Sequence, residues 1–426
     1  MRARQSSDAE RSLAATALRV LPGGNFGNMA TDIVMREGKA AHLWDISGNR
    51  YIDYLLGSGP MVIGHAHPEV VAAVTEQIAR GSTFFVNNEH GIRLAEAIVD
   101  AMPCAGKVRF CSTGSEATFF AMRVARAFRK RDKILKFEGG YHGNNDYAHM
   151  STVPKRPGNF PAAAMDTAGI PKVLESEILV APFNDADAAT TIIEEHRDEL
   201  AGVICEPMQR LIPPKSGFLQ ALRAVTAKHE IPLIFDEIVT GFRLAYGGAQ
   251  EYYGVVPDIA ALGKIIGGGY PLGAIAGRAD IMAHFDKSAS GDGYAAQTGT
   301  LNGNPVAAVA GLATLEVLRR PGSYERLFAN GRALRSALEA ALSASGLPAT
   351  VVGEPPLFDV VFARGSMHDY RTTAKGDAAM LKRFNTALLE RGILKADNKI
   401  YISLAHTGED IAETAAAFRA AAQTLS

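Results

Sequence analysis

The chain has 426 residues, a formal net charge of −1, 47% hydrophobic residues and 21% charged residues. This near-neutral balance argues against nucleic acid or an anionic membrane as the main partner. Its three cysteines, Cys104, Cys111 and Cys205, form no CxxC pair and no Cys/His cluster, so we expect neither a disulfide framework nor a metal site.

The sequence predicts a cytoplasmic protein that is neither secreted nor inserted in a membrane. The first twenty residues, MRARQSSDAERSLAATALRV, carry charges throughout and lack the apolar core of a secretory signal. The most apolar stretch, residues 257–277, contains Lys264, Pro271 and six glycines. A helix in hydrocarbon would be disfavoured by all three features, so we expect no membrane span.

Three regions follow along the chain. Residues 1–60 predict an N-terminal arm with a small hairpin, AAHLWDISGNRYIDYL, which turns at DISGNR. Residues 61–310 alternate β-rich and helical runs, which predicts an α/β domain with a mostly parallel sheet and helices on both faces. The expected strands cover 107–111, 133–137, 231–238 and a stretch ending near Glu206, and the expected helices begin at Ser115 and cover 219–230.

The last region changes in pattern after an Ala-rich helical run over 305–319. Residues 311–426 predict a smaller α+β domain, to which residues 1–60 also belong. Its expected elements are strands over 357–363 and 399–404 and a terminal helix over 409–425.

Lys264 raises the question of chemistry, because it lies among apolar residues and glycines in PDIAALGKIIGGGYPLGAIAG. Such a lysine often packs its stem while its ammonium group reaches water. Alternatively, desolvation lowers its pKa and makes the amine a nucleophile toward a carbonyl carbon. An aldehyde cofactor would then form a Schiff base with it. For pyridoxal 5'-phosphate, such a site also needs a phosphate cradle, a carboxylate and an aromatic cover.

The segment CSTGSEATFF, residues 111–120, is the candidate cradle, because it follows a predicted strand and opens a helix. Gly114 lets the backbone approach an anion closely, and Ser115 offers a hydroxyl and an N–H at the helix N-terminus. A plain N-cap with Glu116 in the first turn explains these residues equally well.

The candidate carboxylate is Asp236, which closes the apolar strand in PLIFDEIVTGFR, where an unpaired charge is costly. A protonated pyridine nitrogen would be a suitable partner, and Ile238 projects to the same side and can pack on the ring. A salt bridge to an arginine, or a strand-ending turn, also explains Asp236. Glu237 points the other way and is expected to be structural.

The candidate aromatic cover lies in GGYHGNN, residues 139–145. Tyr141 or His142 can stack on a cofactor ring. An ordinary glycine turn after the strand at 133–137 explains the stretch as well.

Together these segments resemble the class III (ω-type) aminotransferases, which have the fold type I architecture of pyridoxal-phosphate enzymes. The signature is LIFDEIVTGFR followed by PDIAALGKIIGGGYPLGA. Further family landmarks occur in the same order, namely LWDISGNRYIDY, GHAHPEV, STGSEA, YHG, EPMQ and GTLNGNP. The most similar subgroup is that of the glutamate-1-semialdehyde aminomutase-like proteins, from LPGG near residue 21 onward.

The resemblance implies a role for each matched residue. Lys264 would form the Schiff base and move the proton, and Asp236 would hold the pyridine nitrogen. The other implied cofactor contacts are Gly114 and Ser115 at the phosphate, Tyr141 stacked on the ring with His142 beside it, Ile238 behind the ring, Gln209 at the phenolic oxygen with Glu206 supporting it, and Thr300 of a partner subunit at the phosphate. The implied unit is a homodimer with its active site at the interface.

The implied reaction moves an amino group from an amine or amino acid to a keto acid or aldehyde by a ping-pong mechanism. An aminomutase of the glutamate-1-semialdehyde type, or an amino-acid epimerase, is the alternative on the same scaffold. In the aminomutases the run after LPGG ends in an arginine that binds the substrate carboxylate, whereas this sequence has Ala30 there. We therefore expect this chain not to be a true aminomutase.

Two further departures bear on the substrate. Relatives often continue after EPMQ with a Gly-rich turn, whereas this chain places Arg210 there. Arg210, Arg243 or Lys395 could still supply a cation for a carboxylate. Phe84 and Phe85 would suit a hydrophobic or aromatic amine or a β-amino acid, although core or dimer packing explains them equally well.

Overall fold

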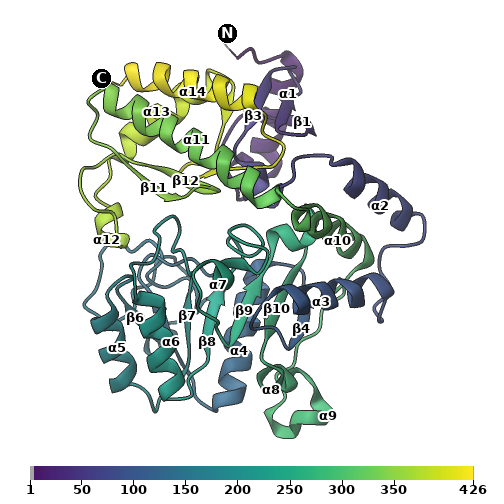
Figure 1. Ribbon diagram of the computed structural model, residues 1–426, viewed down its shortest axis with the longest axis vertical. Coiled ribbons are helices and arrows are strands. Elements are labelled where there is room, and N and C mark those ends of the chain that lie inside the picture. The colour runs from purple at the N-terminus through teal and green to yellow at the C-terminus, as the bar shows by residue number, and fades with distance from the viewer. Residues whose placement is uncertain (1–3, 426) are drawn as a thin grey trace. The chain divides into compact units, whose positions relative to one another are not determined.

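A computed structural model describes residues 4–425 (Figure 1). The chain forms two compact units. The large unit comprises residues 69–320 and 367–374, and the small unit comprises residues 4–68, 321–366 and 375–425. None of the helices within residues 4–425 combines the length and apolar composition that a bilayer crossing requires.

The large unit is built on a seven-stranded sheet in the order β4-β10-β9-β8-β7-β5-β6. Its strands are β4 (Lys107–Cys111), β5 (Lys133–Phe137), β6 (Ile178–Ala181), β7 (Leu200–Cys205), β8 (Leu233–Asp236), β9 (Ile259–Leu262) and β10 (Gly273–Gly277). β10 runs antiparallel to β4 and β9, and the other six strands share one direction. The predicted α/β fold with a mostly parallel sheet is confirmed.

Helices cover both faces of this sheet (Figure 1). α4 (Gly114–Arg129) packs on the face that contains Ile134, and α5 (Ala186–Glu195) and α6 (Phe218–Lys228) pack on the face that contains Leu135. Successive strand residues therefore enter opposite cores, which explains why these strands are apolar throughout. The remaining helices of this part are α2 (Pro68–Ile78), α3 (Glu89–Ala101), α7 (Gly248–Tyr252), α8 (Ala279–Met282), α9 (Lys287–Ser290), α10 (Pro305–Arg319) and α12 (Tyr370–Thr373).

The strand predicted over 231–238 is shorter at both ends. Pro232 has no N–H for the strand ladder, so β8 begins at Leu233. At the other end, the Asp236 side chain accepts a hydrogen bond from the N–H of Ile238, which turns the chain out of the sheet.

The small unit contains two sheets and four longer helices. One sheet has the order β1-β2-β3-β13 and the other β11-β12-β14. The strands are β1 (Met35–Lys39), β2 (His42–Asp45), β3 (Arg50–Asp53), β11 (Thr350–Glu354), β12 (Leu357–Val361), β13 (Ile393–Leu394) and β14 (Ile400–Tyr401), and the helices are α1 (Asp8–Val20), α11 (Ser323–Ala344), α13 (Ala378–Leu389) and α14 (Gly408–Gln423). The predicted hairpin is β2–β3, in which Leu43 pairs with Tyr51.

The carboxyl ends of the parallel strands in the large unit meet at one edge of its sheet. The loops after β4, β5, β7, β8 and β9 therefore start side by side. In open α/β sheets, ligands bind at this edge. Four of these loops begin within a residue or two of Gly114, Glu206, Asp236 and Lys264.

Candidate active site

The first turn of α4 presents an anion-binding helix end. Its N-cap is Thr113, whose hydroxyl accepts from the N–H of Glu116 at 3.1 Å, while the Glu116 carboxylate accepts from the N–H of Thr113 at 3.0 Å. This capping box leaves Gly114 and Ser115 in the first turn, where backbone N–H groups have no intrahelical acceptor. The helix dipole adds partial positive charge at this point. The N-cap and the phosphate cradle are therefore compatible, because they use different residues.

Close glycine packing draws the loops of this edge together. A Cβ atom on Gly143 would lie 2.6 Å from Cα of Ser115, so only glycine fits there. Cβ atoms on Gly114 and on Gly263 would each lie 3.1 Å from Cδ1 of Ile238. Ile238 thus packs against both glycines, one at the start of α4 and the other directly before Lys264.

Asp236 and His142 form a buried pair at the end of β8. Oδ2 of Asp236 lies 2.8 Å from Nδ1 of His142, and Oδ1 accepts from the N–H of Ile238 at 3.1 Å. Their exposed fractions are only 6% and 1%. The partner of Asp236 is thus a histidine, and the arginine salt bridge considered above is wrong. Within residues 4–425, Nε2 of His142 is buried without a hydrogen-bond partner.

Glu206 and Gln209 lie on the neighbouring loop after β7. The two carboxylate oxygens of Glu206 accept from the N–H groups of Tyr141 at 2.8 Å and Arg210 at 3.0 Å, so Glu206 fixes backbone on two loops. Nε2 of Gln209 donates to the carbonyl of Glu138 at 2.7 Å. Its Oε1 is buried and finds no donor among the described residues.

Tyr141 keeps its ring 38% exposed in this buried surrounding. Its hydroxyl donates to Oδ1 of Asn144 at 3.0 Å, and Cζ of Arg210 lies 5.4 Å from its ring centroid. Burial raises the pKa of Tyr141, although the charge of Arg210 opposes this shift. The ring is therefore a neutral, accessible aromatic surface.

Lys264 follows β9 and the extended Gly263, and it begins a short 3₁₀ turn, Lys264–Gly267. Its φ angle is +49°, in the left-handed region that non-glycine residues rarely adopt. Such backbone costs about 1–2 kcal/mol and is found disproportionately at functional sites. Lys264 is half-buried.

Thr300 is the predicted site residue that the structure does not bring to this cluster. It lies in an exposed turn, and Gly299 and Asn302 beside it line a cavity of about 410 Å³ together with Phe85 and Val86. Within residues 4–425 it makes no hydrogen bond with the residues around Lys264.

Lys136 is a buried residue at this edge that the sequence analysis missed. It is 1% exposed, and its Nζ donates to the carbonyls of Gly140, Ala148 and Met150 at 3.0, 2.7 and 2.5 Å. Burial lowers its pKa to about 7. Lys136 therefore fastens the loop that carries Tyr141 and His142. A lysine inside the apolar strand KILKF was the available signal.

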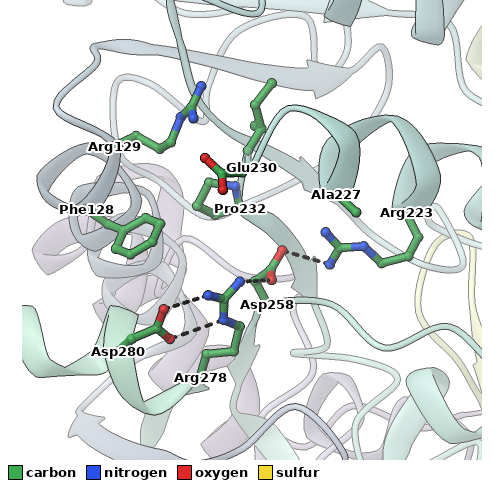
Figure 2. Close-up of a pocket in the computed structure, with 10 residues that line it drawn as sticks. Phe128, Arg129, Arg223, Ala227, Glu230, Pro232, Asp258, Arg278 and Asp280 are labelled. Carbon is green, nitrogen blue, oxygen red and sulfur yellow. Dashed lines mark hydrogen bonds and ion pairs between the residues drawn. The ribbon is translucent and has the colours of Figure 1, made fainter.

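A second cavity, of about 700 Å³, lies at the opposite edge of the same sheet (Figure 2). Asp258 stands between Arg223 and Arg278, with oxygen–nitrogen distances of 2.7 and 2.8 Å, and Arg278 also pairs with Asp280 at 2.6 Å. These charged groups satisfy one another. The side chains at the carboxyl edge, in contrast, include buried polar atoms without partners among the described residues.

The comparison with known families decides the identity. The model of the family "Aminotransferase class-III" matches residues 25–419. The chain belongs to the class III aminotransferases. It is 44% identical over 383 residues to the glutamate-1-semialdehyde 2,1-aminomutase of Methanothermobacter thermautotrophicus, covering 88% of this chain and 89% of that one.

Solved structures of other aminotransferases share the fold of this class III chain. An omega-transaminase from Sphaerobacter thermophilus superposes with a TM-score of 0.94 at 37% identity over 99% of both chains. A beta-phenylalanine aminotransferase from Variovorax paradoxus superposes with a TM-score of 0.85 at 32% identity, covering 96% of this chain and 93% of that one. The predicted family, fold type I architecture and enzyme class are confirmed.

Class III aminotransferases use pyridoxal 5'-phosphate, and the residues at the carboxyl edge fit that cofactor. The helix end at Gly114 and Ser115 suits a phosphate, and the exposed ring of Tyr141 suits an aromatic ring. Oε1 of Gln209 is a buried acceptor without a protein donor, which a polar ligand group would satisfy.

Proposed function

We propose that this enzyme moves an amino group from an amine or amino acid donor to a keto acid or aldehyde acceptor in two half-reactions, with Lys264 as the catalytic amine. The observation that carries the proposal is the packing of Ile238 against both Gly114 and Gly263. This packing gathers Lys264, the start of α4 and the Asp236–His142 pair at one edge of the sheet.

The cofactor supplies, when bound, an aldehyde carbon and an electron-withdrawing ring. Lys264 would hold that carbon between turnovers. When free, its amine would take a proton from the substrate carbon as a general base and deliver it to the former aldehyde carbon of the cofactor as a general acid.

The other residues bind and orient. The carboxylate of Asp236 would stabilise positive charge on the ring nitrogen, and His142, whose Nδ1 lies 2.8 Å from that carboxylate, would hold it in position. Gly114 and Ser115 would hold the phosphate, Tyr141 and Ile238 would contact the ring, and Gln209 would bind the phenolic oxygen. Glu206 supports this arrangement by fixing the backbone of Tyr141.

A homodimer is the proposed functional unit, with Thr300 reaching the phosphate of the partner subunit. Phe85 and Val86 are 72% and 73% exposed beside the cavity next to Thr300, and Leu301 is 42% exposed. Phe85 is therefore not packed in the core of this chain, and exposed apolar side chains such as Phe85 and Val86 beside a cavity favour a protein interface. We place this dimer in the cytoplasm, where three free buried cysteines are expected.

An aminomutase is the second candidate, because the relative named as one is 44% identical to this chain. Ala30 argues against it, since alanine cannot pair with a substrate carboxylate where the aminomutases have arginine. Supplying glutamate-1-semialdehyde and measuring 5-aminolevulinate tests this. Formation at a kcat/KM well above that of the best amine donor would establish the aminomutase instead.

Borohydride reduction of the cofactor-loaded enzyme, followed by peptide mapping, tests the main proposal. We expect the label on Lys264 alone, and Lys264→Ala to lose both label and turnover while it stays folded. Lys136→Met, at a buried lysine of the same edge, should keep the label. A label on any other lysine would remove Lys264 from its role.

A further inference from the structure

Arg210 occupies a backbone position that normally belongs to glycine. The N–H of Gln209 donates to the carbonyl of Ile212 at 3.0 Å, and the N–H of Ile212 donates back at 2.8 Å, so Arg210 and Leu211 form a two-residue turn. The φ angle of Arg210 is +59°. Two-residue turns favour glycine where φ is positive. The arginine therefore carries a conformational cost that glycine avoids, and residues retained at such positions point to a function of the side chain.

The turn is held so that Arg210 faces the site. Its N–H donates to Oε2 of Glu206, whose Oε1 binds the N–H of Tyr141, so one carboxylate fixes both backbones. The guanidinium carbon lies 5.4 Å from the ring centroid of Tyr141. Arg210 is half-buried, and among residues 4–425 it forms no ion pair with a carboxylate. The guanidinium N–H groups of Arg210 therefore remain available to a ligand beside Tyr141.

The other two candidate cations are buried. Arg243 is completely buried; its Nε donates to the carbonyl of Val239 at 3.0 Å, and its Nη1 is buried without a hydrogen-bond partner among the described residues. Lys395 lies in the small unit with its Nζ 2.7 Å from Oδ2 of Asp359, and both side chains are buried. Arg210 is therefore the most accessible of the three cations, and it contacts Tyr141.

We propose that Arg210 binds the carboxylate of the substrate and selects amino acids and keto acids over amines and carbonyl compounds without a carboxylate. A guanidinium presents two parallel N–H groups that match a carboxylate, which fixes orientation as well as affinity. Residue 210 thereby supplies the function that Ala30 cannot. This inference rests on the proposed aminotransferase activity and names the substrate class for the same site.

Matched donor pairs test the assignment. 3-Amino-3-phenylpropanoate and 1-phenylpropylamine differ by a carboxylate in place of a methyl group, as do alanine and isopropylamine. In Arg210→Gln we expect kcat/KM to fall about 10- to 100-fold for the carboxylate member of each pair that the enzyme accepts, mainly through KM. For the uncharged member we expect a change of less than about threefold. Arg210→Lys should retain part of the preference, because it keeps the charge but loses the bidentate geometry.

Arg210→Gly separates binding from folding. It should lose the carboxylate preference like Arg210→Gln, yet melt at the same or a higher temperature, because glycine relieves the turn. Arg223→Gln, at an arginine on α6 that pairs with Asp258 at the opposite edge of the sheet, serves as the control and should leave the preference unchanged.

Four results would overturn the inference. An equal loss for both members of each pair would show that Arg210 only positions Tyr141, and no loss for either would show that it binds no substrate. A wild-type enzyme that uses the uncharged donors but neither carboxylate donor would contradict the substrate class alone. Absence of amino transfer from all four donors would instead refute the proposed function, and this inference with it.

Discussion

Asp236 and Asp258 are both buried aspartates at the ends of neighbouring strands, but they lie at opposite edges of the large unit's sheet. Asp258 receives hydrogen bonds from Arg223, Arg278 and the N–H of Leu233, all at 2.7–2.8 Å. Among the described residues, Asp236 receives only those of His142 and the N–H of Ile238. A carboxylate has about four acceptor positions, so Asp236 keeps spare hydrogen-bonding capacity, whereas Asp258 has two arginine partners that balance its charge.

Two histidines show the same contrast. In the small unit, Nδ1 of His406 accepts from the N–H of Ser403 at 3.0 Å, and its Nε2 donates to the carbonyl of Asp53 at 3.1 Å. His142 is equally buried, but its Nε2 has no partner among the described residues. Since buried polar groups are normally satisfied, the unpaired Nε2 of His142 beside Asp236 favours a ligand site at this edge.

We expect the largest effect from a substitution of Asp236 at the carboxyl edge of the sheet. Asp236→Asn keeps the shape of the side chain but removes the charge that stabilises a protonated ring nitrogen. We expect the rate of the first half-reaction to fall at least about 10²-fold, which corresponds to about 3 kcal/mol. Stopped-flow absorbance with a donor amine measures it. Near-normal rates would show that Asp236 does not stabilise the ring nitrogen.

Lys136→Met tests a buried lysine at the same edge, whose Nζ donates hydrogen bonds to backbone carbonyls. Methionine leaves the carbonyl of Met150 and two neighbouring carbonyls without the Nζ donors, so we expect the free energy of unfolding at pH 8 to fall by about 3 kcal/mol. Chemical denaturation measures this, and Lys215→Met on the surface is the control. Unchanged stability would mean that the loop carrying Tyr141 is held by other contacts.

Asp258→Asn tests the opposite edge of the sheet, where the aspartate has two arginine partners. The variant should lose about 2 kcal/mol of unfolding free energy, because two arginines lose their partner while Arg278 remains half exposed to water. Its half-reaction rate should stay within about threefold of wild type. A rate loss as large as that of Asp236→Asn would abolish the contrast between the two edges.

The smallest effect concerns pH. Burial lowers the pKa of His406 to about 4, whereas the unfolded chain has the ordinary value of 6.5. Between pH 4 and 6.5 the unfolded state therefore binds more protons, and stability rises with pH across this window. We expect the unfolding free energy of the wild type to rise by about 1–2 kcal/mol more between pH 5 and 7 than that of His406→Gln. An equal change in unfolding free energy between pH 5 and 7 in the two proteins would contradict this expectation.

The sequence predicted several regular elements well, because they depend on local pattern, whereas the roles of the candidate site residues stay a prediction. The strand at 107–111 and the helix at 305–319 appear with the predicted bounds. Local pattern could not reveal that Asp236 pairs with His142, since 94 residues separate them. Lys136 was missed because lysine in a strand is usually exposed, and only the fold shows the carbonyls around it. The positive φ of Arg210 likewise requires coordinates, although the missing glycine after EPMQ indicated an unusual turn.

The protonation state of the cofactor's ring nitrogen tests the central claim most directly. Enzyme loaded with pyridoxal phosphate labelled with ¹⁵N in the ring would be measured by NMR for the wild type, Asp236→Asn and Asp258→Asn. We predict the shift of a protonated nitrogen in the wild type and in Asp258→Asn, and that of an unprotonated nitrogen in Asp236→Asn. The same shift in all three proteins would contradict the assignment of Asp236, and with it the use of spare hydrogen-bonding capacity to locate the active site.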